Sequence, residues 1–350
     1  MILKYIRLII IKIRLIVALG GGIKIKNIIK DIHEPYLFEK GFTIDTNKQY
    51  NAMGQCYKID PKIGKGYYWI YAHNNLFAIA IHDFYFYEDY LLECRLPEYL
   101  SITYYDSLSG EELNPYKRLN AGCVKGYWSN QTVYKALFHK NIPIRSIGIE
   151  ITPEYYEDYL KSKYSGEYIS PRSAVLSIDE DTNFPEMVLL LHQIRNYKGT
   201  GMAARLFFES KVTEAISLLV ERSKQIKPKT PRRITKQDLE HLETVTAYIN
   251  DHYAYDLHLD NLSQIACMGI TKLKSSFKEV YKCTITEYIQ HRRMGQAEHL
   301  LANTELNIGQ IARIVGYHSA SRFSELFKKS TGLLPSKYRE LSLGENSHLL

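Results

Sequence analysis

The amino-acid sequence predicts a two-domain α+β protein, with a β-rich N-terminal domain flanked by helices and an all-α C-terminal domain. Three observations predict this division. Short runs with strand-like spacing, separated by turn residues, fill most of residues 31–165. Residues 226–237 are basic, contain two prolines and are typical of a linker. After the linker one helical pattern occurs twice, at 259–289 and at 308–339.

Residues 1–30 form a basic, apolar leader with seven Lys or Arg side chains and no acidic one. They account for the whole net charge of +7, so the charge of the chain is no sign of nucleic-acid binding. Lys12 and Arg14 interrupt the apolar core that a signal peptide or a transmembrane helix needs. Two interpretations stay open: a basic amphipathic helix on a membrane surface, and a mis-assigned start with the natural protein beginning between 23 and 30.

The N-terminal domain, 31–165, is expected to be a small barrel or sandwich. Apolar and aromatic residues alternate with polar ones in several runs, and Asn, Gly, Ser and Pro clusters separate these runs. The strands we expect are 66–71, a strand beginning at 76 in the run 76–90, 99–105, 133–138 and 145–151.

The pattern becomes helical at Thr152, where Thr152 can cap a helix with Pro153 in its first turn. Within the helical segment 166–225, an amphipathic helix is predicted from 202 to 225. Two interpretations of this helix stay open. It can pair two protomers, or it can simply pack on the β domain.

The C-terminal domain, 238–341, is expected to contain two helix-turn-helix units joined by a long helix, before a short tail at 342–350. A supporting helix covers 238–252, and the connecting helix 284–303 begins with a Thr284…Glu287 capping box. Asn307…Gln310 repeats that box at the second unit. The two candidate reader helices, which would present side chains to DNA bases, begin near 271 and 320.

Each reader helix has an apolar inner face and a polar outer face. Leu273 and Phe277 are expected inside the first, and Phe323 and Phe327 inside the second. Two such helices on rigid supports can enter successive major-groove segments about one helical turn apart, roughly 34 Å. The outward residues that we expect at the DNA are Thr271, Lys272, Lys274, Ser275 and Lys278, then Ser321, Arg322, Ser324, Glu325 and Lys328.

The C-terminal region resembles the AraC/XylS family of transcription regulators. The resemblance is carried by IARIVGYHSASRFSELFKKSTGLLPSKYR and by the connector YIQHRRMGQAEHLLANTELNI. It implies base-edge contacts from Thr271, Lys272, Lys274 and Ser275, and from Ala320, Ser321, Ser324 and Glu325. Arg293 matches the family's connector arginine and is expected to contact the DNA backbone, whereas Lys328 and Lys329 are expected at phosphates or in solvent. Cys267 and Gly269 depart from the family pattern at the first turn.

The N-terminal half is more faintly similar to the cupin-like effector domain of that family. GMAARLFFESKVTEAISLLVE is similar to a helix of the siderophore-responsive, pyochelin-regulator-like branch, which implies a small-molecule effector. Aromatic side chains that could line an effector pocket are Tyr68, Trp69, Tyr71, Tyr85, Tyr87 and Tyr104. The alternative is cross-strand packing, because adjacent strand residues point to opposite faces.

These observations predict a bacterial, DNA-binding regulator rather than an enzyme, without cofactor or metal. His73 and His82 do not form the HxH pair of metal-dependent cupin enzymes, and the five scattered cysteines suit a reducing compartment, hence the cytoplasm. The expected partners are double-stranded DNA, an effector, a second copy of the chain and, for an activator, RNA polymerase. The alternatives are a cupin-type metalloenzyme with a DNA-binding tail, and a constitutive DNA-binding protein whose N-terminal domain only dimerises.

Overall fold

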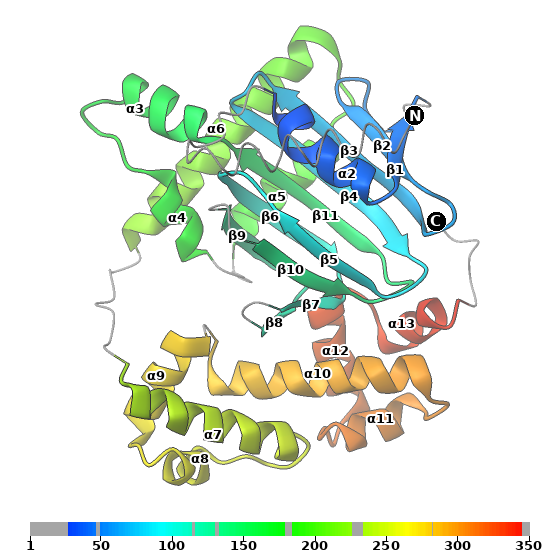
Figure 1. Ribbon diagram of the computed structural model, residues 1–350, viewed down its shortest axis with the longest axis vertical. Coiled ribbons are helices and arrows are strands. Elements are labelled where there is room, and N and C mark those ends of the chain that lie inside the picture. The colour runs from blue at the N-terminus through cyan, green and yellow to red at the C-terminus, as the bar shows by residue number, and fades with distance from the viewer. Residues whose placement is uncertain are drawn as a thin grey trace.

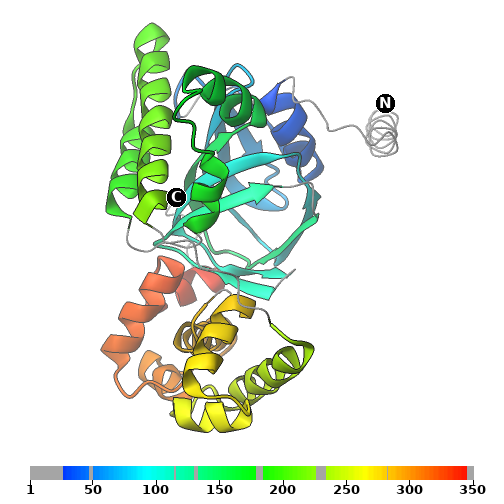
Figure 2. The same ribbon diagram turned by 90° about the vertical axis from the view of Figure 1, so that its left-hand side faces the viewer.

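The computed structural model describes residues 27–46, 50–113, 116–129, 133–178, 184–225, 234–281 and 283–344. The predictions for most of the leader, for most of the linker and for the end of the tail lie outside these residues. Figures 1 and 2 show a β-rich body with flanking helices above a purely helical body. The predicted two-domain α+β fold class is confirmed.

Two antiparallel sheets build the N-terminal domain and curve around a common interior (Figure 2). The larger sheet has the strand order β1-β2-β3-β4-β11-β6-β9, and the smaller has the order β5-β10-β7-β8. The strands are β1 Phe42–Asp45, β2 Gln55–Ile59, β3 Gly64–His73, β4 Phe77–Phe86, β5 Tyr90–Arg95, β6 Tyr99–Ser107, β7 Gly110–Leu113, β8 Tyr116–Leu119, β9 Val124–Ser129, β10 Val133–Phe138 and β11 Ile144–Ile151.

Helices cover the outer face of the larger sheet, and a short helical segment lies at the N-terminal side of the domain (Figure 1). These helices are η1 Ile29–His33, α2 Glu34–Glu39, η2 Glu154–Tyr159, α3 Leu160–Lys163, α4 Pro171–Ser177, α5 Pro185–Asn196 and α6 Gly201–Gln225. Strand residues at alternate positions therefore face either the helices or the interior between the two sheets.

Helix α6 packs on the β domain, the second of the two interpretations of this segment. Its buried stripe runs through Ala204, Phe208, Val212 and Leu219, and Phe208 lies 4.7 Å from the ring of Tyr71. Leu206 on the same helix is exposed. A role for α6 in dimerisation stays a prediction.

The C-terminal domain contains the two expected helix-turn-helix units, α8–α9 and α11–α12, joined by α10 (Figure 1). The predicted capping boxes at Thr284 and Asn307 are both present. Each unit has its own apolar core, around Leu262 and Phe277 in the first and around Ile311 and Phe323 in the second. The helices are α7 Lys236–His252, α8 Leu259–Ile265, α9 Ile270–Tyr281, α10 Ile285–Asn303, α11 Ile308–Ile314, α12 Ala320–Thr331 and α13 Pro335–Ser342.

Candidate DNA-binding surface and effector cavity

The first reader helix, α9, presents the predicted polar face to solvent. Thr271, Lys274 and Lys278 are exposed. The Ser275 hydroxyl donates to carbonyl oxygens of its own helix. Lys272 is also exposed, but its Nζ lies 2.5 Å from a carboxylate oxygen of Asp238 on α7. A base contact by Lys272 therefore has to compete with this ion pair.

The second reader helix, α12, is held firmly at its N-terminus, where the Ser319 hydroxyl accepts a hydrogen bond from the Arg322 amide. Ser324 is half-buried, and its hydroxyl donates to the Ala320 carbonyl. Arg322 Nη1 lies 3.3 Å from Glu325, so the two charges partly cancel on the outer face. The other candidate contacts on this helix are all exposed: Ala320, Ser321 and Lys328.

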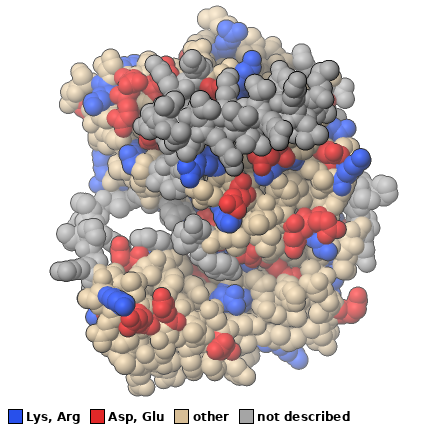
Figure 3. Space-filling view, in the orientation of Figure 1, with Lys and Arg blue, Asp and Glu red and all other residues tan. Residues whose placement is uncertain are grey.

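Charge on the helical domain is mixed rather than concentrated. On the face seen in Figure 3, Lys and Arg alternate with Asp and Glu over this domain. This agrees with the neutral balance of the chain beyond the leader. The candidate DNA contacts are therefore the few side chains that the two reader helices present, and the described residues on this face form no broad positive patch.

Arg293 makes contacts that the sequence did not predict. Its guanidinium donates hydrogen bonds to the carbonyl oxygens of Tyr253, Tyr255 and Gly316, at 2.7, 3.0 and 2.9 Å. Each of its three nitrogens makes one of these bonds. A contact of Arg293 with the DNA backbone stays a prediction. Arg293 ties the loop before α8 to the turn of the second unit.

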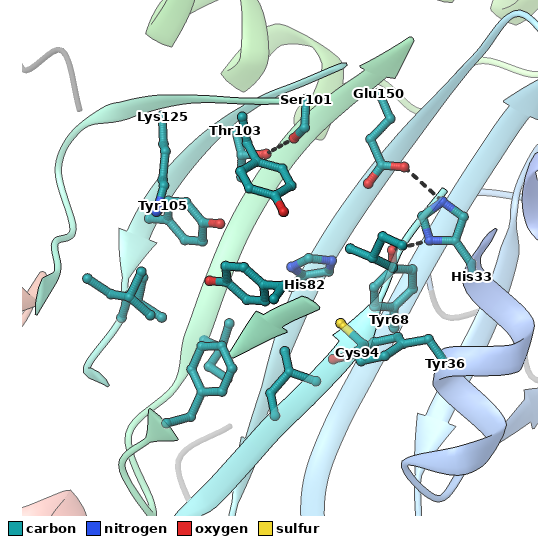
Figure 4. A pocket seen from close by; sticks show the side chains of 18 of the residues that line it. His33, Tyr36, Tyr68, His82, Cys94, Ser101, Thr103, Tyr105, Lys125 and Glu150 are labelled. Carbon is teal, nitrogen blue, oxygen red and sulfur yellow. Dashed lines mark hydrogen bonds and ion pairs between the residues drawn. The ribbon is translucent and has the colours of Figure 1, made fainter. Parts of the chain in front are cut away.

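A cavity of about 170 Å³ lies between the two sheets of the N-terminal domain (Figure 4). Aromatic and aliphatic side chains make up most of its wall. Strand β6 shows the alternation clearly, because Tyr99, Ser101, Thr103 and Tyr105 line the cavity while the residues between them do not. The lining also includes His33, Tyr36, Tyr68, His82, Phe84, Leu92, Glu112, Leu119, Lys125, Tyr134 and Glu150.

Of the six aromatic residues predicted to line a pocket, Tyr68 lines this cavity and the other five do not. Trp69, Tyr71 and Tyr104 belong to the core beneath the helices, on the opposite face of the larger sheet. Tyr85 alternates with the cavity residues Phe84 and Phe86, and Tyr87 follows the end of β4. The physical reason is the period of two along a strand, which sends neighbouring side chains to opposite faces.

The polar and charged groups of the cavity contact one another. A carboxylate oxygen of Glu150 lies 2.9 Å from His33 Nε2, and the Tyr68 hydroxyl lies 2.7 Å from His33 Nδ1, as Figure 4 shows. Lys125 pairs with Glu112 across the cavity. The sequence alone could not predict the contact between His33 and Glu150, because His33 precedes the first strand and Glu150 lies on the last.

The two histidines of the alternative metalloenzyme hypothesis face different environments. His82 lines the cavity, where burial lowers its pKa to about 4, and its Nδ1 lies 2.8 Å from the Ser146 hydroxyl. His73 lies 3.3 Å from Glu209 on α6. They therefore do not face a common metal site.

Four ionisable residues form a cluster between the two domains: Glu111, Arg118, His139 and, on α10, Glu298. Arg118 pairs with Glu298, and each of these two side chains is 2% exposed. His139 lies between the carboxylates, 3.1 Å from Glu111 and 3.5 Å from Glu298. Burial alone would lower the pKa of His139, but its hydrogen bonds to Glu111 and Glu298 outweigh burial and raise it to about 10.

The same cluster contains the one group of possible metal ligands found in the described part of the chain: Glu111, His139 and Glu298, with ligand atoms within 4.8 Å of one another. With His139 protonated, the charges of the two carboxylates balance those of the guanidinium and the imidazolium. The cluster is therefore complete as an ion-pair network, and a metal ion would have to displace the His139 proton.

The smaller sheet is the wall between this cluster and the cavity. Along β7, Glu111 points to the helical domain and Glu112 lines the cavity. Along β8, Arg118 points to the helical domain and Leu119 lines the cavity. One layer of strands therefore separates the cavity from α10.

The β domain also caps the C-terminal end of the second reader helix. The Ala121 amide donates to the Ser330 carbonyl at 2.7 Å, and the Leu108 amide donates to the Thr331 carbonyl at 3.2 Å. The following residue, Gly332, has a φ of +79°, and a Cβ there would overlap the Asp106 carbonyl oxygen. The position of α12 is therefore tied directly to the loops of the β domain.

Comparisons with known proteins agree with both halves of the chain. Residues 262–341 match the Helix-turn-helix domain family, and residues 77–234 match the family described as Regulatory protein PchR N-terminal domain. None of the helices in the described segments is long and apolar enough to cross a membrane.

Among curated relatives, the chain is 34% identical over 111 residues to the bifunctional transcriptional activator/DNA repair enzyme AdaA of Bacillus subtilis, covering 32% of this chain and 53% of that one. It is 34% identical over 94 residues to the arabinose operon regulatory protein of Salmonella typhimurium, covering 26% and 33%. The C-terminal domain of the response regulator AraT from Geobacillus stearothermophilus aligns with 29% identity and a TM-score of 0.28, covering 31% and 88%. The chain spans about half or less of these two curated relatives. The chain therefore joins a PchR-type N-terminal region to a helix-turn-helix domain similar to those of AraC/XylS-type regulators.

Proposed function

We propose that the protein is a sequence-specific, DNA-binding transcription regulator of the bacterial cytoplasm. The observation that carries this proposal is the pair of helix-turn-helix units, each with an exposed polar face on its second helix. Relatives whose names describe transcription regulators support it. RNA polymerase is a further partner if the protein activates transcription, and dimerisation through exposed residues of α6 such as Met202 and Leu206 is part of the proposal.

The test is selection of bound sequences from random double-stranded DNA by the full chain. We expect one sequence with two half-sites in adjacent major-groove segments. Lys274→Ala should weaken binding to that sequence while non-specific binding stays unchanged, because a base contact carries specificity and a phosphate contact does not. Equal weakening on both kinds of DNA would make Lys274 a phosphate contact.

We further propose that the cavity binds the effector, and that the effector is uncharged and largely apolar. Glu150 already contacts His33, and Lys125 already pairs with Glu112, so a charged ligand would have to break one of those contacts or stay unpaired in an apolar site. The volume of about 170 Å³ is similar to the roughly 150 Å³ cavity that holds benzene in an engineered protein. A molecule built around one aromatic ring therefore fits.

Three small aromatic probes of nearly equal shape test this class of ligand: acetophenone, benzoate and benzamidine. Acetophenone should raise the melting temperature of the full chain saturably, and the two ions should bind more than about tenfold more weakly, because each buries an unpaired charge. Leu92→Trp should abolish binding by filling the cavity. Leu91→Trp, on the exposed side of the same strand, is the matched control. Tighter binding of benzoate or benzamidine would overturn the charge assignment.

The proposed route from effector to DNA is a shift between docking states of the two domains. A ligand that displaces Leu119 or Glu112 also displaces β8 or β7. On their opposite face these strands place Arg118 and Glu111 in the cluster with Glu298 of α10. If no probe binds and DNA binding persists, the alternative of a constitutive regulator is favoured. Bound metal that is lost on changing His82 would favour the metalloenzyme alternative.

A further inference from the structure

We propose that Arg293 fixes the separation and relative orientation of the two reader helices, and thereby the half-site spacing that the protein accepts on DNA. This inference rests on the proposed DNA-binding function and assigns one residue a positioning role within it. It replaces the DNA-backbone contact that the sequence suggested for Arg293.

The geometry places one planar group at the joint of the two units. Arg293 lies on α10, the helix that connects them. Its Nε and Nη2 hold the Tyr253 and Tyr255 carbonyls in the loop leading to α8, and its Nη1 holds the Gly316 carbonyl in the turn before α12. A guanidinium presents its donors in a rigid fork, so three bonds fix both distance and angle.

The backbone around Arg293 is packed too closely to shift without breaking these bonds. Gly316 has a φ of +88°, and a Cβ there would lie 2.5 Å from the Ala254 carbonyl oxygen and 2.9 Å from Arg293 Cζ. The ring of Tyr317 lies 5.1 Å from the same guanidinium carbon, in a cation–π contact. The loop of the first unit and the turn of the second therefore pack against each other, and this side chain bonds to both.

The apolar cores do not supply an equivalent joint. The buried residues around Leu262 and Phe277 form one cluster, and those around Ile311 and Phe323 form a separate cluster. Helix α10 contributes to both, Ile285 to the first and Met294 to the second. The polar joint at Arg293 is what links the two units across the helix.

A rigid joint makes half-site spacing part of sequence recognition. Each base pair inserted between two half-sites moves them apart by about 3.4 Å and rotates them by about 35°. Two reader helices held at a fixed separation cannot follow this change and lose the base contacts of one half-site. Helices joined more loosely can follow it.

The test measures affinity of the full chain for its selected DNA sequence and for versions with one base pair inserted or removed between the half-sites. For the wild type we expect at least about tenfold weaker binding to the altered spacings, from the loss of base contacts in one half-site. Arg293→Lys keeps the charge but not the fork, and should reduce this discrimination at least about fivefold. Its salt dependence should match the wild type.

Arg313→Ala is the matched control, because it removes an exposed arginine from α11, outside the reader helices. It should keep the spacing discrimination of the wild type. Arg293→Ala should lose spacing discrimination as Arg293→Lys does. If the melting curve of Arg293→Ala shows that it does not fold, the test rests on the lysine variant.

Two results would overturn the inference. The first is an Arg293→Lys variant that discriminates between spacings as well as the wild type does. The second is an Arg293→Ala variant that keeps this discrimination while its salt slope falls by about one, which would make Arg293 a phosphate contact. If the wild type selects no discrete sequence at all, the proposed DNA-binding function fails, and the inference fails with it. If the wild type instead selects a discrete sequence but tolerates any spacing of its half-sites, the inference about Arg293 fails and the DNA-binding function stands.

Discussion

Replacing Glu298 by Gln tests whether the interdomain ion-pair cluster holds the two domains together. Glu298 and Arg118 are each 2% exposed, so solvent does not screen their interaction. The change leaves Arg118 and His139 with one carboxylate, that of Glu111. Removing one partner of a buried pair typically costs about 3–5 kcal/mol. We expect about 3 kcal/mol, because the Gln carbonyl still accepts a hydrogen bond from Arg118.

The protein can limit this cost by separating the domains, which lets water reach Arg118. The expected result is therefore uncoupling rather than uniform destabilisation. Scanning calorimetry of the full chain should show one coupled transition in the wild type. In Glu298→Gln the helical domain should unfold in a separate step, at a temperature lower by roughly 10 °C or more.

Glu340→Gln is the control, because Glu340 pairs with Lys337 at a partly exposed position on α13. This change should cost less than about 1 kcal/mol and leave the coupled transition intact. A single transition in Glu298→Gln, within about 1 kcal/mol of the wild type, would refute the reasoning. The cluster would then contribute little to domain docking.

Three further predictions follow from the same structure. Lys274→Ala should weaken the binding free energy by about 1–3 kcal/mol at its own half-site. Lys272→Ala should weaken it less, because Asp238 already pairs with Lys272. Affinities for the selected sequence compare the two variants, and equal losses would show that Asp238 does not compete with DNA for Lys272. Gly332→Ala should undock α12, because a Cβ there overlaps the Asp106 carbonyl; calorimetry checks this, and an unchanged coupled transition would exclude it. The folded pKa of His139 is raised from 6.5 to about 10, so its contribution to docking is fully present below about pH 6.5 and is lost as the pH rises towards about 10; a docking transition that does not change across this range would show that His139 is not protonated in the cluster.

The helical domain was largely predictable because its signals are local. Capping boxes such as Thr284…Glu287 and Asn307…Gln310 join residues three apart, and the inward positions of Phe277 and Phe323 follow from the helical period. The site residues on the outer faces of both reader helices follow from the same period. The structure leaves these residues on exposed or half-buried surface, and their contacts with DNA stay proposals.

The interdomain and cavity residues were not predictable, because their partners are remote in sequence. Arg118 and Glu298 are 180 positions apart, and neither has a charged partner on its own element to mark it. Arg293 is a related case, since a lone arginine on a connecting helix suggested a phosphate contact, and its three carbonyl partners could not be read from the sequence. In the cavity, composition indicated aromatic residues but not which face of the sheet each one takes.

The measurement that tests the central claim most directly is a footprint of the full chain on its selected DNA. We predict two protected major-groove segments, roughly 34 Å apart along one face of the duplex. Lys274→Ala should weaken protection of one segment, and Ser321→Ala should weaken protection of the other. Protection of a single segment, or uniform protection without a preferred sequence, would contradict the account.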